Sequence, residues 1–327
     1  MLGVRCSRKC EMIPTRNSSN PTLTAVPDLA VGHASDQEAA TGCTVILGPF
    51  RAAVDVRGLA SGTRQLDSLA ANHLADRVDA LLLTGGSAYG LAAADGVATW
   101  LEEQGRGFET DAGRIAIVPS AVIFDLGTGK SDVRPDAAMG RAACEAANRA
   151  PVAEGRVGVG TGASVGKAFG RPGAMPGGVG SFATELEGSV VAALVVVNAF
   201  GDVLDGRGKI IAGARDDKGE FIDTAAYIRE QGPPPKFAGH PGTNTTLGVV
   251  ASDYPLACSD LQTVARQAMN ALVRRTSPAN TQYDGDLVFA CSTGPKAGEV
   301  SPAQLLRIGL CAEWVLAQAI ERAVVAR

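Results

Sequence analysis

The stretch Gly242-Thr243-Asn244-Thr245-Thr246-Leu247-Gly248-Val249-Val250-Ala251-Ser252 carries the most informative pattern in the chain. A polar Asn-Thr-Thr cluster follows a Pro/Gly-rich loop and leads into an apolar, β-branched run that predicts a strand. Cleavage of the Asn244–Thr245 peptide bond would give a new chain that begins with Thr245. Its hydroxyl, a poor nucleophile without a base, would then lie beside a free amine that can be that base. A threonine that simply starts a strand is the simpler explanation of the local sequence alone.

Length and composition set the frame for this hypothesis. The 327 residues suit one large domain, and an apolar content of 46% allows a sizeable core. We expect a mobile N-terminal tail at 1–28 and a single domain at 29–327. The net charge of -4 with no long basic run argues against nucleic acid as a partner. No apolar run approaches the ~20 residues of a membrane span, so no membrane partner is expected.

The seven cysteines are scattered along the chain, and most lie in apolar surroundings. Cys6 and Cys10 are spaced loosely like metal ligands, but no second pair follows them. The sequence therefore predicts no metal site, and a reducing cytoplasm is the simplest compartment.

Short apolar runs alternate with helical patterns in an order that favours a layered α+β fold over a repeated βαβ array. Strands are expected at Thr44–Leu47, Ala52–Val56, Ala80–Leu83, Ile115–Val118, Val190–Val197 and Leu247–Ala251. Helices are expected at Leu66–Arg77, at Ala88–Gln104, after a capping pattern at Ser259 and Gln262, and at Leu305–Ala323 after Ser301-Pro302. Glycine-rich residues 155–180 and Pro/Gly-rich residues 231–243 have the composition of loops.

Three further segments carry side chains suited to an active site. Asp284-Gly285-Asp286 could orient an ammonium group and a hydroxyl, although Asp-Gly is also an ordinary turn signal. Lys167, in a glycine-rich loop, could stabilise developing negative charge or could be a solvated loop lysine. Asn198, at the end of an apolar run, could donate to an oxyanion or form a turn.

The turn Thr84-Gly85-Gly86-Ser87-Ala88-Tyr89-Gly90 links a predicted strand to a predicted helix. It lacks the G-x-G-x-x-G spacing of a dinucleotide site, so a substrate-lining turn or an anion site at the helix start is the better interpretation. Within it, Gly86 and Tyr89 are candidates for lining the substrate. No G-x-S-x-G elbow occurs, and the three histidines share no motif with a serine or cysteine.

Taken together, the segments resemble the self-cleaving N-terminal-nucleophile hydrolases. That family includes L-aminopeptidase/D-esterase, β-peptidyl aminopeptidases and the endo-type 6-aminohexanoate-oligomer (nylon oligomer) hydrolase. The similarity runs from about Leu29 to Val325. It rests on segments in the same order, namely Ala53–Gly58, Thr84–Gly90, Ser120–Asp125, Ala163–Lys167, Asn244–Asp253 and Asp284–Asp286. The Asn-Thr junction and the Asp-Gly-Asp pair look like the nylon-oligomer branch.

The resemblance implies an αββα sandwich, a homo-oligomer, no cofactor, and self-cleavage between Asn244 and Thr245 into an α chain (1–244) and a β chain (245–327). It implies that Thr245 is the nucleophile with its α-amine as base. Lys167 and Asn198 match the family's site lysine and oxyanion-side asparagine, and Asp284 and Asp286 match its acidic pair.

One position departs from the pattern. Phe124 stands where close relatives carry a tyrosine, so the site has no hydroxyl there, although Phe124 remains a candidate for lining the substrate. Tyr89 is the candidate replacement for that hydroxyl.

The sequence thus predicts an amide hydrolase acting on a small peptide or amide through an acyl-enzyme. Two alternatives stay open at this point. One is acyl transfer of the ornithine-acetyltransferase type, which also follows self-cleavage before a threonine. The other is a non-enzymatic, uncleaved relative that kept the fold.

Overall fold

The structure, a computed structural model, describes residues 21–234, 244–295 and 298–326. Its centre is formed by two β-sheets that share one long strand, β2 (Thr41–Val56). The first part of β2 pairs with β1 and β4, its last part pairs with β16, and the register shifts between Leu47 and Phe50. Such an irregularity bends a strand, which lets β2 serve both sheets. The two short strands expected at Thr44–Leu47 and Ala52–Val56 are therefore parts of one strand.

We name the two sheets after their central strands. The β14 sheet consists of β10 (Gly178–Leu186), β11 (Ser189–Asn198), β14 (Thr245–Ser252), β16 (Leu287–Ser292) and the end of β2. The β4 sheet consists of β1 (Ala30–Asp36), the start of β2, β4 (Val78–Thr84), β7 (Ser120–Val122) and β3 (Thr63–Arg64). Smaller pairings join β5 (Phe108–Thr110) to β6 (Gly113–Ile115), β8 (Ser164–Val165) to β9 (Met175–Pro176), and β12 (Asp202–Leu204) to both β13 (Ile210–Ala212) and β15 (Thr276–Ser277).

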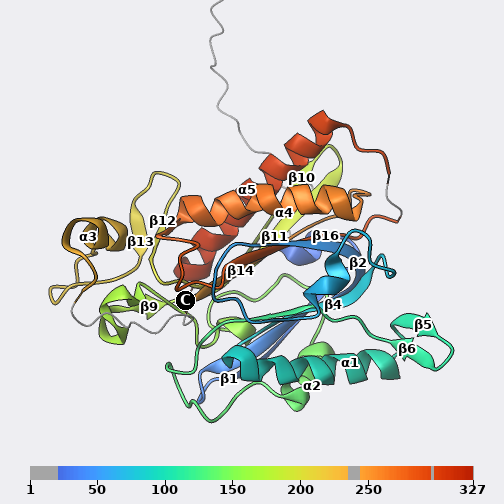
Figure 1. Ribbon diagram of the computed structural model, residues 1–327, viewed down its shortest axis with the longest axis horizontal. Coiled ribbons are helices and arrows are strands. Elements are labelled where there is room, and N and C mark those ends of the chain that lie inside the picture. The colour runs from blue at the N-terminus through green and yellow to red at the C-terminus, as the bar shows by residue number, and fades with distance from the viewer. Residues whose placement is uncertain (1–20, 235–243, 296–297, 327) are drawn as a thin grey trace, which may run out of the picture.

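Helices cover the outer face of each sheet (Figure 1). The β14 sheet is covered by α4 (Cys258–Arg275) and α5 (Pro302–Val325), and the β4 sheet by α1 (Ala93–Glu103) and α2 (Ala137–Glu145). The short helix α3 (Thr224–Gln231) lies to one side, beyond β13.

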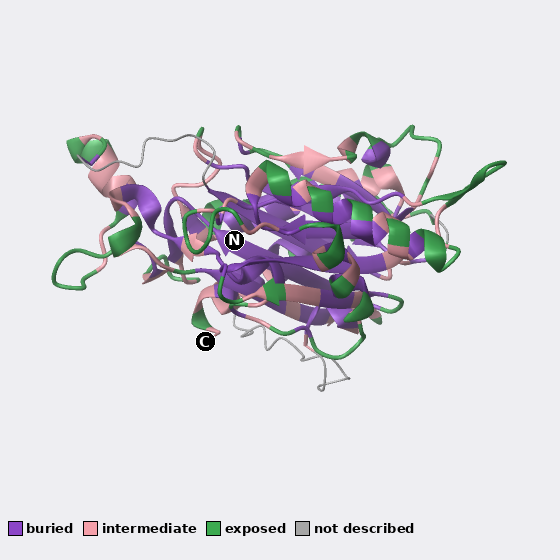
Figure 2. Cartoon of the chain, turned by 90° about the horizontal axis from the view of Figure 1, so that it is seen from below, coloured by how far each residue is buried: buried purple, intermediate pink, exposed green. Residues whose placement is uncertain are grey.

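Strand alternation supplies three apolar cores to these four layers, because successive side chains point to opposite faces of a sheet. On β14, Leu247 and Val249 are buried between the two sheets, whereas Val250 packs toward α4 and α5. On β4, Leu81 also faces the other sheet, and Leu82 packs toward α1 and α2. Figure 2 shows the buried strands at the centre and exposed residues on the outer helix surfaces and loops. The expected αββα sandwich is confirmed.

The tail expected at residues 1–28 extends too far, because residues 21–28 are part of the folded domain. Leu23 and Val26 are fully buried in the core between the sheets, and the Leu23 amide donates to Ser181 Oγ at 2.8 Å. Residues 21–28 thus belong to the domain because they bury apolar side chains. The rest of the expected tail, residues 1–20, lies outside the described residues.

Further expected elements differ in the structure. The helix at Leu66–Arg77 is only a 3₁₀ turn, Leu66–Leu69, since the following residues are mostly exposed and have no apolar face to bury. The strand at Ile115–Val118 is wrong: the amides of Ile117 and Val118 donate to side chains, and Pro119 offers no amide. Helix α4 begins before Ser259, and Asp260 accepts from the backbone amide of Ala257 at 3.1 Å.

The later helix at Leu305–Ala323 is confirmed as part of α5, with the Ser301 cap. The helix expected at Ala88–Gln104 is confirmed in its second part as α1, and its first part is a 3₁₀ helix, Ser87–Ala92. The glycine-rich segment 155–180 contains β8 and β9 and is largely buried, so it is more ordered than its composition suggested.

Candidate active site

Thr245 and Asn198 face each other across neighbouring strands. Thr245 is the first residue of β14, Asn198 is the last residue of β11, and the two are directly paired in the antiparallel register. Both are almost completely buried, at 4% and 0% exposure. Each lies two residues from a side chain of the core between the sheets, Leu247 on β14 and Val196 on β11, so both side chains point into that space.

The carbonyl oxygen of Asn244 accepts two hydrogen bonds at the expected cleavage junction. The Thr245 hydroxyl donates to it at 2.5 Å, and the Gly285 amide donates to it at 2.9 Å. The Asn244 side chain is held as well, since its Nδ2 donates to the Tyr283 carbonyl at 3.1 Å. The Thr245 hydroxyl oxygen therefore lies against the peptide bond that self-cleavage would break, and a backbone amide polarises the same carbonyl.

Gly285 is required at its position for steric reasons. A Cβ atom there would lie 2.9 Å from Thr245 Oγ1 and 2.8 Å from the Ala60 carbonyl oxygen. Real Cβ atoms do not approach other atoms that closely, so any side chain would displace the hydroxyl or the backbone. This close approach explains the glycine between the two aspartates.

Lys167 is buried beside Asn198. Its Nζ donates to the Asn198 side-chain oxygen at 2.7 Å and to the Asn198 carbonyl at 3.0 Å. The preceding Gly166 adopts a left-handed conformation (φ +70°), and a Cβ atom there would lie 2.1 Å from the Ala214 nitrogen. Burial, together with the charge of Arg171, lowers the pKa of Lys167 to about 7. The lysine thus supplies a donor, and near neutral pH a positive charge, to Asn198, the strand partner of Thr245.

The carboxamide of Asn198 is fixed at both of its ends. Its Oδ1 accepts from Lys167 Nζ and from the Ser164 amide at 3.1 Å, so its Nδ2 is turned toward the Phe124 carbonyl, to which it donates at 3.1 Å. Phe124 therefore contributes backbone to this site. A donor role of Asn198 toward an oxyanion stays a prediction and would use the second hydrogen of Nδ2.

The two aspartates hold the loop around the junction. Asp286 accepts from the Thr246 amide at 2.6 Å and the Asn280 amide at 3.0 Å, and Asp284 accepts from the Thr281 hydroxyl at 2.6 Å. Within the described residues these bonds go to neighbours of Thr245 and not to its hydroxyl.

Both carboxyl groups have raised pKa values. Burial raises the pKa of Asp284, and burial together with the Asp284 charge raises that of Asp286 to about 7. Asp286 holds the start of β14 through the Thr246 amide, and a direct contact of either carboxylate with a Thr245 amine stays a prediction for the cleaved chain.

Sequence reasoning assigned no role to one buried carboxylate, Asp125. It accepts from Thr41 Oγ1 at 2.7 Å and from the Gly86 amide at 2.8 Å, and its charge acts on Lys167. Burial raises its pKa. Asp125 closes the Ser120–Asp125 motif, so the signal was present in the sequence, but only the fold shows what it binds.

The candidates Gly86 and Tyr89 lie in the same glycine turn, but Gly86 is buried and Tyr89 is exposed. Gly86 is held by Asp125 and adopts φ +77°. Tyr89 is 62% exposed, and the Arg134 guanidinium lies 3.9 Å from its ring centroid. Nothing in the described structure ties the Tyr89 hydroxyl to Thr245, so its use as a replacement for the missing tyrosine stays a prediction.

Metal-binding clusters and helices able to cross a membrane are both absent from the described residues. Across residues 21–234, 244–295 and 298–326, no group of three or more His, Cys, Asp or Glu side chains is placed to bind a metal ion. Cys6 and Cys10 lie outside those ranges. The helices in the same ranges include none with the length and apolar character needed to cross a membrane.

Comparison with known sequences identifies close relatives along almost the whole chain. A family model described as peptidase family S58 matches residues 21–327. An uncharacterized aminopeptidase of Mycobacterium tuberculosis is 42% identical over 325 residues, which cover 91% of this chain and 92% of the relative. A 6-aminohexanoate-oligomer endohydrolase of Kocuria sp. is 33% identical over 291 residues, covering 86% of this chain and 78% of the relative.

Solved structures share the fold at lower sequence identity. An L-aminopeptidase D-Ala-esterase/amidase from Ochrobactrum anthropi, described as a variant of the Ntn hydrolase fold, has a TM-score of 0.71 at 21% identity and covers 94% of this chain and 87% of that one. A β-aminopeptidase from Burkholderia sp. has a TM-score of 0.69 at 21% identity, covering 95% and 87%. With this fold, and with a family model and relatives that span nearly its full length, the chain belongs to peptidase family S58 and is a hydrolase of peptide or amide bonds.

Proposed function

We propose that this protein is a self-processing amide hydrolase that cuts its own chain between Asn244 and Thr245 and then uses Thr245 as an N-terminal nucleophile. The observation that carries this proposal is the Asn244 carbonyl oxygen, which accepts from both the Thr245 hydroxyl and the Gly285 amide. The reacting oxygen and a donor for the developing negative charge are thus together before any cut.

Self-cleavage would proceed as an N→O acyl shift. The Thr245 oxygen attacks the Asn244 carbonyl carbon, a C–O bond forms, and the C–N bond breaks as the nitrogen takes up a proton. Water then hydrolyses the ester. The products are the Asn244 carboxylate at the end of the α chain (1–244) and a free amine and hydroxyl on Thr245 at the start of the β chain (245–327).

The same atoms would then act on a substrate. The α-amine of Thr245 takes the hydroxyl proton as the oxygen attacks the substrate amide, and it returns that proton to the leaving amine. Lys167 fixes Asn198 and adds positive charge near neutral pH, and both would stabilise the oxyanion. Loss of one such donor typically costs ~10²–10³ in rate. Water finally releases the acyl group from the Thr245 oxygen.

The substrate is proposed from the relatives, which are named as aminopeptidases and as 6-aminohexanoate-oligomer endohydrolases. We infer a small peptide or a linear amide. We also propose that the αβ units assemble into a homo-oligomer, which light scattering would test, and that the protein acts in the cytoplasm without a cofactor.

The proposal is tested by comparing the wild type with Thr245→Ala and Thr245→Ser on aminoacyl anilides and 6-aminohexanoate oligomers. We expect no hydrolysis by Thr245→Ala and reduced but measurable hydrolysis by Thr245→Ser, which keeps a hydroxyl. Product analysis with an added amine acceptor separates hydrolysis from acyl transfer. Hydrolysis by Thr245→Ala at the wild-type rate would rule out the proposed nucleophile.

A further inference from the structure

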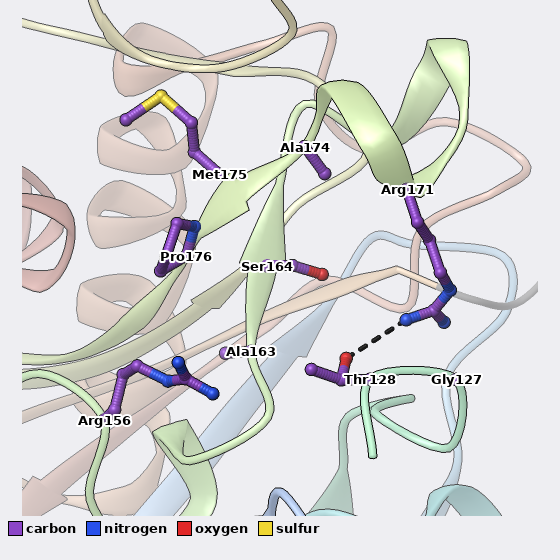
Figure 3. A pocket seen from close by; sticks show the side chains of 9 residues that line it. All are labelled: Gly127, Thr128, Arg156, Ala163, Ser164, Arg171, Ala174, Met175 and Pro176. Atoms are coloured by element: carbon purple, nitrogen blue, oxygen red, sulfur yellow. Dashed lines mark hydrogen bonds between the residues drawn. The ribbon is translucent and has the colours of Figure 1, made fainter.

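A pocket of about 260 Å³ opens beside the β8–β9 hairpin (Figure 3). Its polar and apolar walls come from segments far apart in the sequence. They include Thr128, Arg156, Ser164, Arg171, Met175 and Pro176. The volume suits part of a small ligand, and the proposed mechanism assigns no role to the pocket.

The pocket adjoins the candidate active site through Ser164. The Ser164 amide donates to Asn198 Oδ1 at 3.1 Å, and Asn198 is paired directly with Thr245 across β11 and β14. Directly opposed residues in an antiparallel sheet lie about 5 Å apart, so the Ser164 wall is within roughly 10 Å of Thr245. The pocket wall therefore lies close to the candidate nucleophile.

Two guanidinium groups form opposite walls of this pocket, as Figure 3 shows. Arg171 Nη1 donates to Thr128 Oγ1 at 3.1 Å, and Arg156 Nε donates to the Thr161 carbonyl at 3.1 Å. Both acceptors are neutral, and neither arginine forms an ion pair with a carboxylate of the described residues. By contrast, Arg322 and Arg141 are each paired with glutamates.

The remaining N–H groups of the two arginines can bind an anion. A guanidinium has five N–H donors, and its planar fork matches the two oxygens of a carboxylate. The contact of Arg156 uses only its Nε, which leaves both terminal nitrogens for an end-on, bidentate interaction. The pocket thus offers two positive charges close to the candidate active site.

We propose that this pocket binds a carboxylate of the substrate, so that the protein prefers linear amides that carry a free carboxylate over their uncharged counterparts. This inference rests on the proposed function and deepens it by naming the charge of the substrate. Arg171 and Arg156 are then residues that determine specificity, and they take no part in the bond-breaking steps at Thr245.

The test compares kcat/KM for two matched substrates, the linear dimer of 6-aminohexanoate with a free carboxylate and the same dimer ending in a carboxamide, by measuring the loss of each intact dimer. The readout is the ratio of the two kcat/KM values, which a general loss of stability does not change. For the wild type we expect a ratio of about 10 to 100 in favour of the carboxylate, the range for hydrogen bonds to a charged group. The ratio should fall to about 1 in the double variant Arg156→Gln, Arg171→Gln.

Arg114→Gln is the matched control. Arg114 is an exposed arginine on the β5–β6 hairpin that pairs with Glu109, and its replacement should keep the wild-type ratio. Inorganic phosphate is tested as a competitor, because a pocket with two arginines could bind phosphate instead of a substrate carboxylate. Tighter binding of phosphate than of the carboxylate substrate would assign the pocket to phosphate and overturn the proposal.

The outcomes separate this inference from the proposed function. A ratio near 1 in the wild type, or an unchanged ratio in the double variant, overturns the carboxylate pocket while hydrolysis by Thr245 stands. A wild-type chain that remains uncut and hydrolyses neither dimer overturns the proposed function, and this inference with it.

Discussion

Gly285 is a position of the site where an added side chain would meet the Thr245 hydroxyl itself. Its amide polarises the Asn244 carbonyl, and the missing Cβ leaves room for the Thr245 hydroxyl and for the Ala60 carbonyl. We expect Gly285→Ala to slow self-cleavage by about tenfold or more, because the new methyl group must displace the hydroxyl or the donating amide. The fraction of cut chain over time, measured on denaturing gels, checks this.

Gly206→Ala is the control for that variant. A Cβ at position 206 would meet its nearest neighbour, Arg275 Nη2, at 3.4 Å, an ordinary contact on the surface. Its self-cleavage rate should match the wild type. Equal rates for Gly285→Ala and Gly206→Ala would show that the amide and the space at Gly285 are not needed.

At this scale the sequence predicted which residues meet, but not how they bind. Thr245, Asn198 and Lys167 were expected together, and the structure brings them together through the register of β11 and β14. The contacts of Asp286 with backbone amides were not foreseeable, because those amides are placed by the turn at 280–286 and by the start of β14. The role of Asp125 was missed for the same reason.

At the scale of elements, burial decided which predictions held. The strand at Leu247–Ala251 is confirmed within β14, all of whose residues are buried. The helix at Leu66–Arg77 was wrong because a helical pattern without a buried face gains little from packing; Leu74, for example, is 84% exposed. The continuity of β2 was not predictable from the sequence, because its two halves look like separate strands. Their connection becomes visible only in the fold, where each half pairs with strands of a different sheet.

His33 on β1 lies opposite Thr44 on β2, and its burial predicts that the stability of the protein depends on pH. Its Nδ1 is hydrogen-bonded to Thr44 Oγ1 at 2.9 Å, and burial lowers its pKa from 6.5 to about 4. The unfolded chain takes up a proton below pH 6.5, whereas the folded chain does not until about pH 4. The free energy of unfolding therefore falls as the pH drops through this window, by about 2 kcal/mol at pH 5.

This loss is measured by urea unfolding at pH 7.5 and pH 5.0 in the Thr245→Ala background, in which we expect the chain to remain in one piece. The glutamine in His33→Gln does not titrate, so this variant should lose less free energy of unfolding between pH 7.5 and pH 5.0 than the protein with His33. His73→Gln, at an exposed histidine, should keep the loss seen without it. Equal pH dependence in His33→Gln and His73→Gln would contradict the role given to His33.

At the scale of the whole molecule, the predicted cut falls inside a sheet. β14 would begin the new chain and lies between β11 and the parallel β16, while β16 itself pairs with β2. In this sheet the two strands of the smaller piece thus lie side by side between strands of the larger piece, and α5 packs over the sheet (Figure 1). We expect the pieces to elute together under native conditions, because separating them would expose this core.

The central claim is tested most directly by the intact mass of the purified wild-type protein under denaturing conditions. The account predicts two pieces, one of which has the mass of residues 245–327 and begins with Thr245. A single uncut mass for a protein that hydrolyses amides at its full rate, or a break at any other bond, would contradict it.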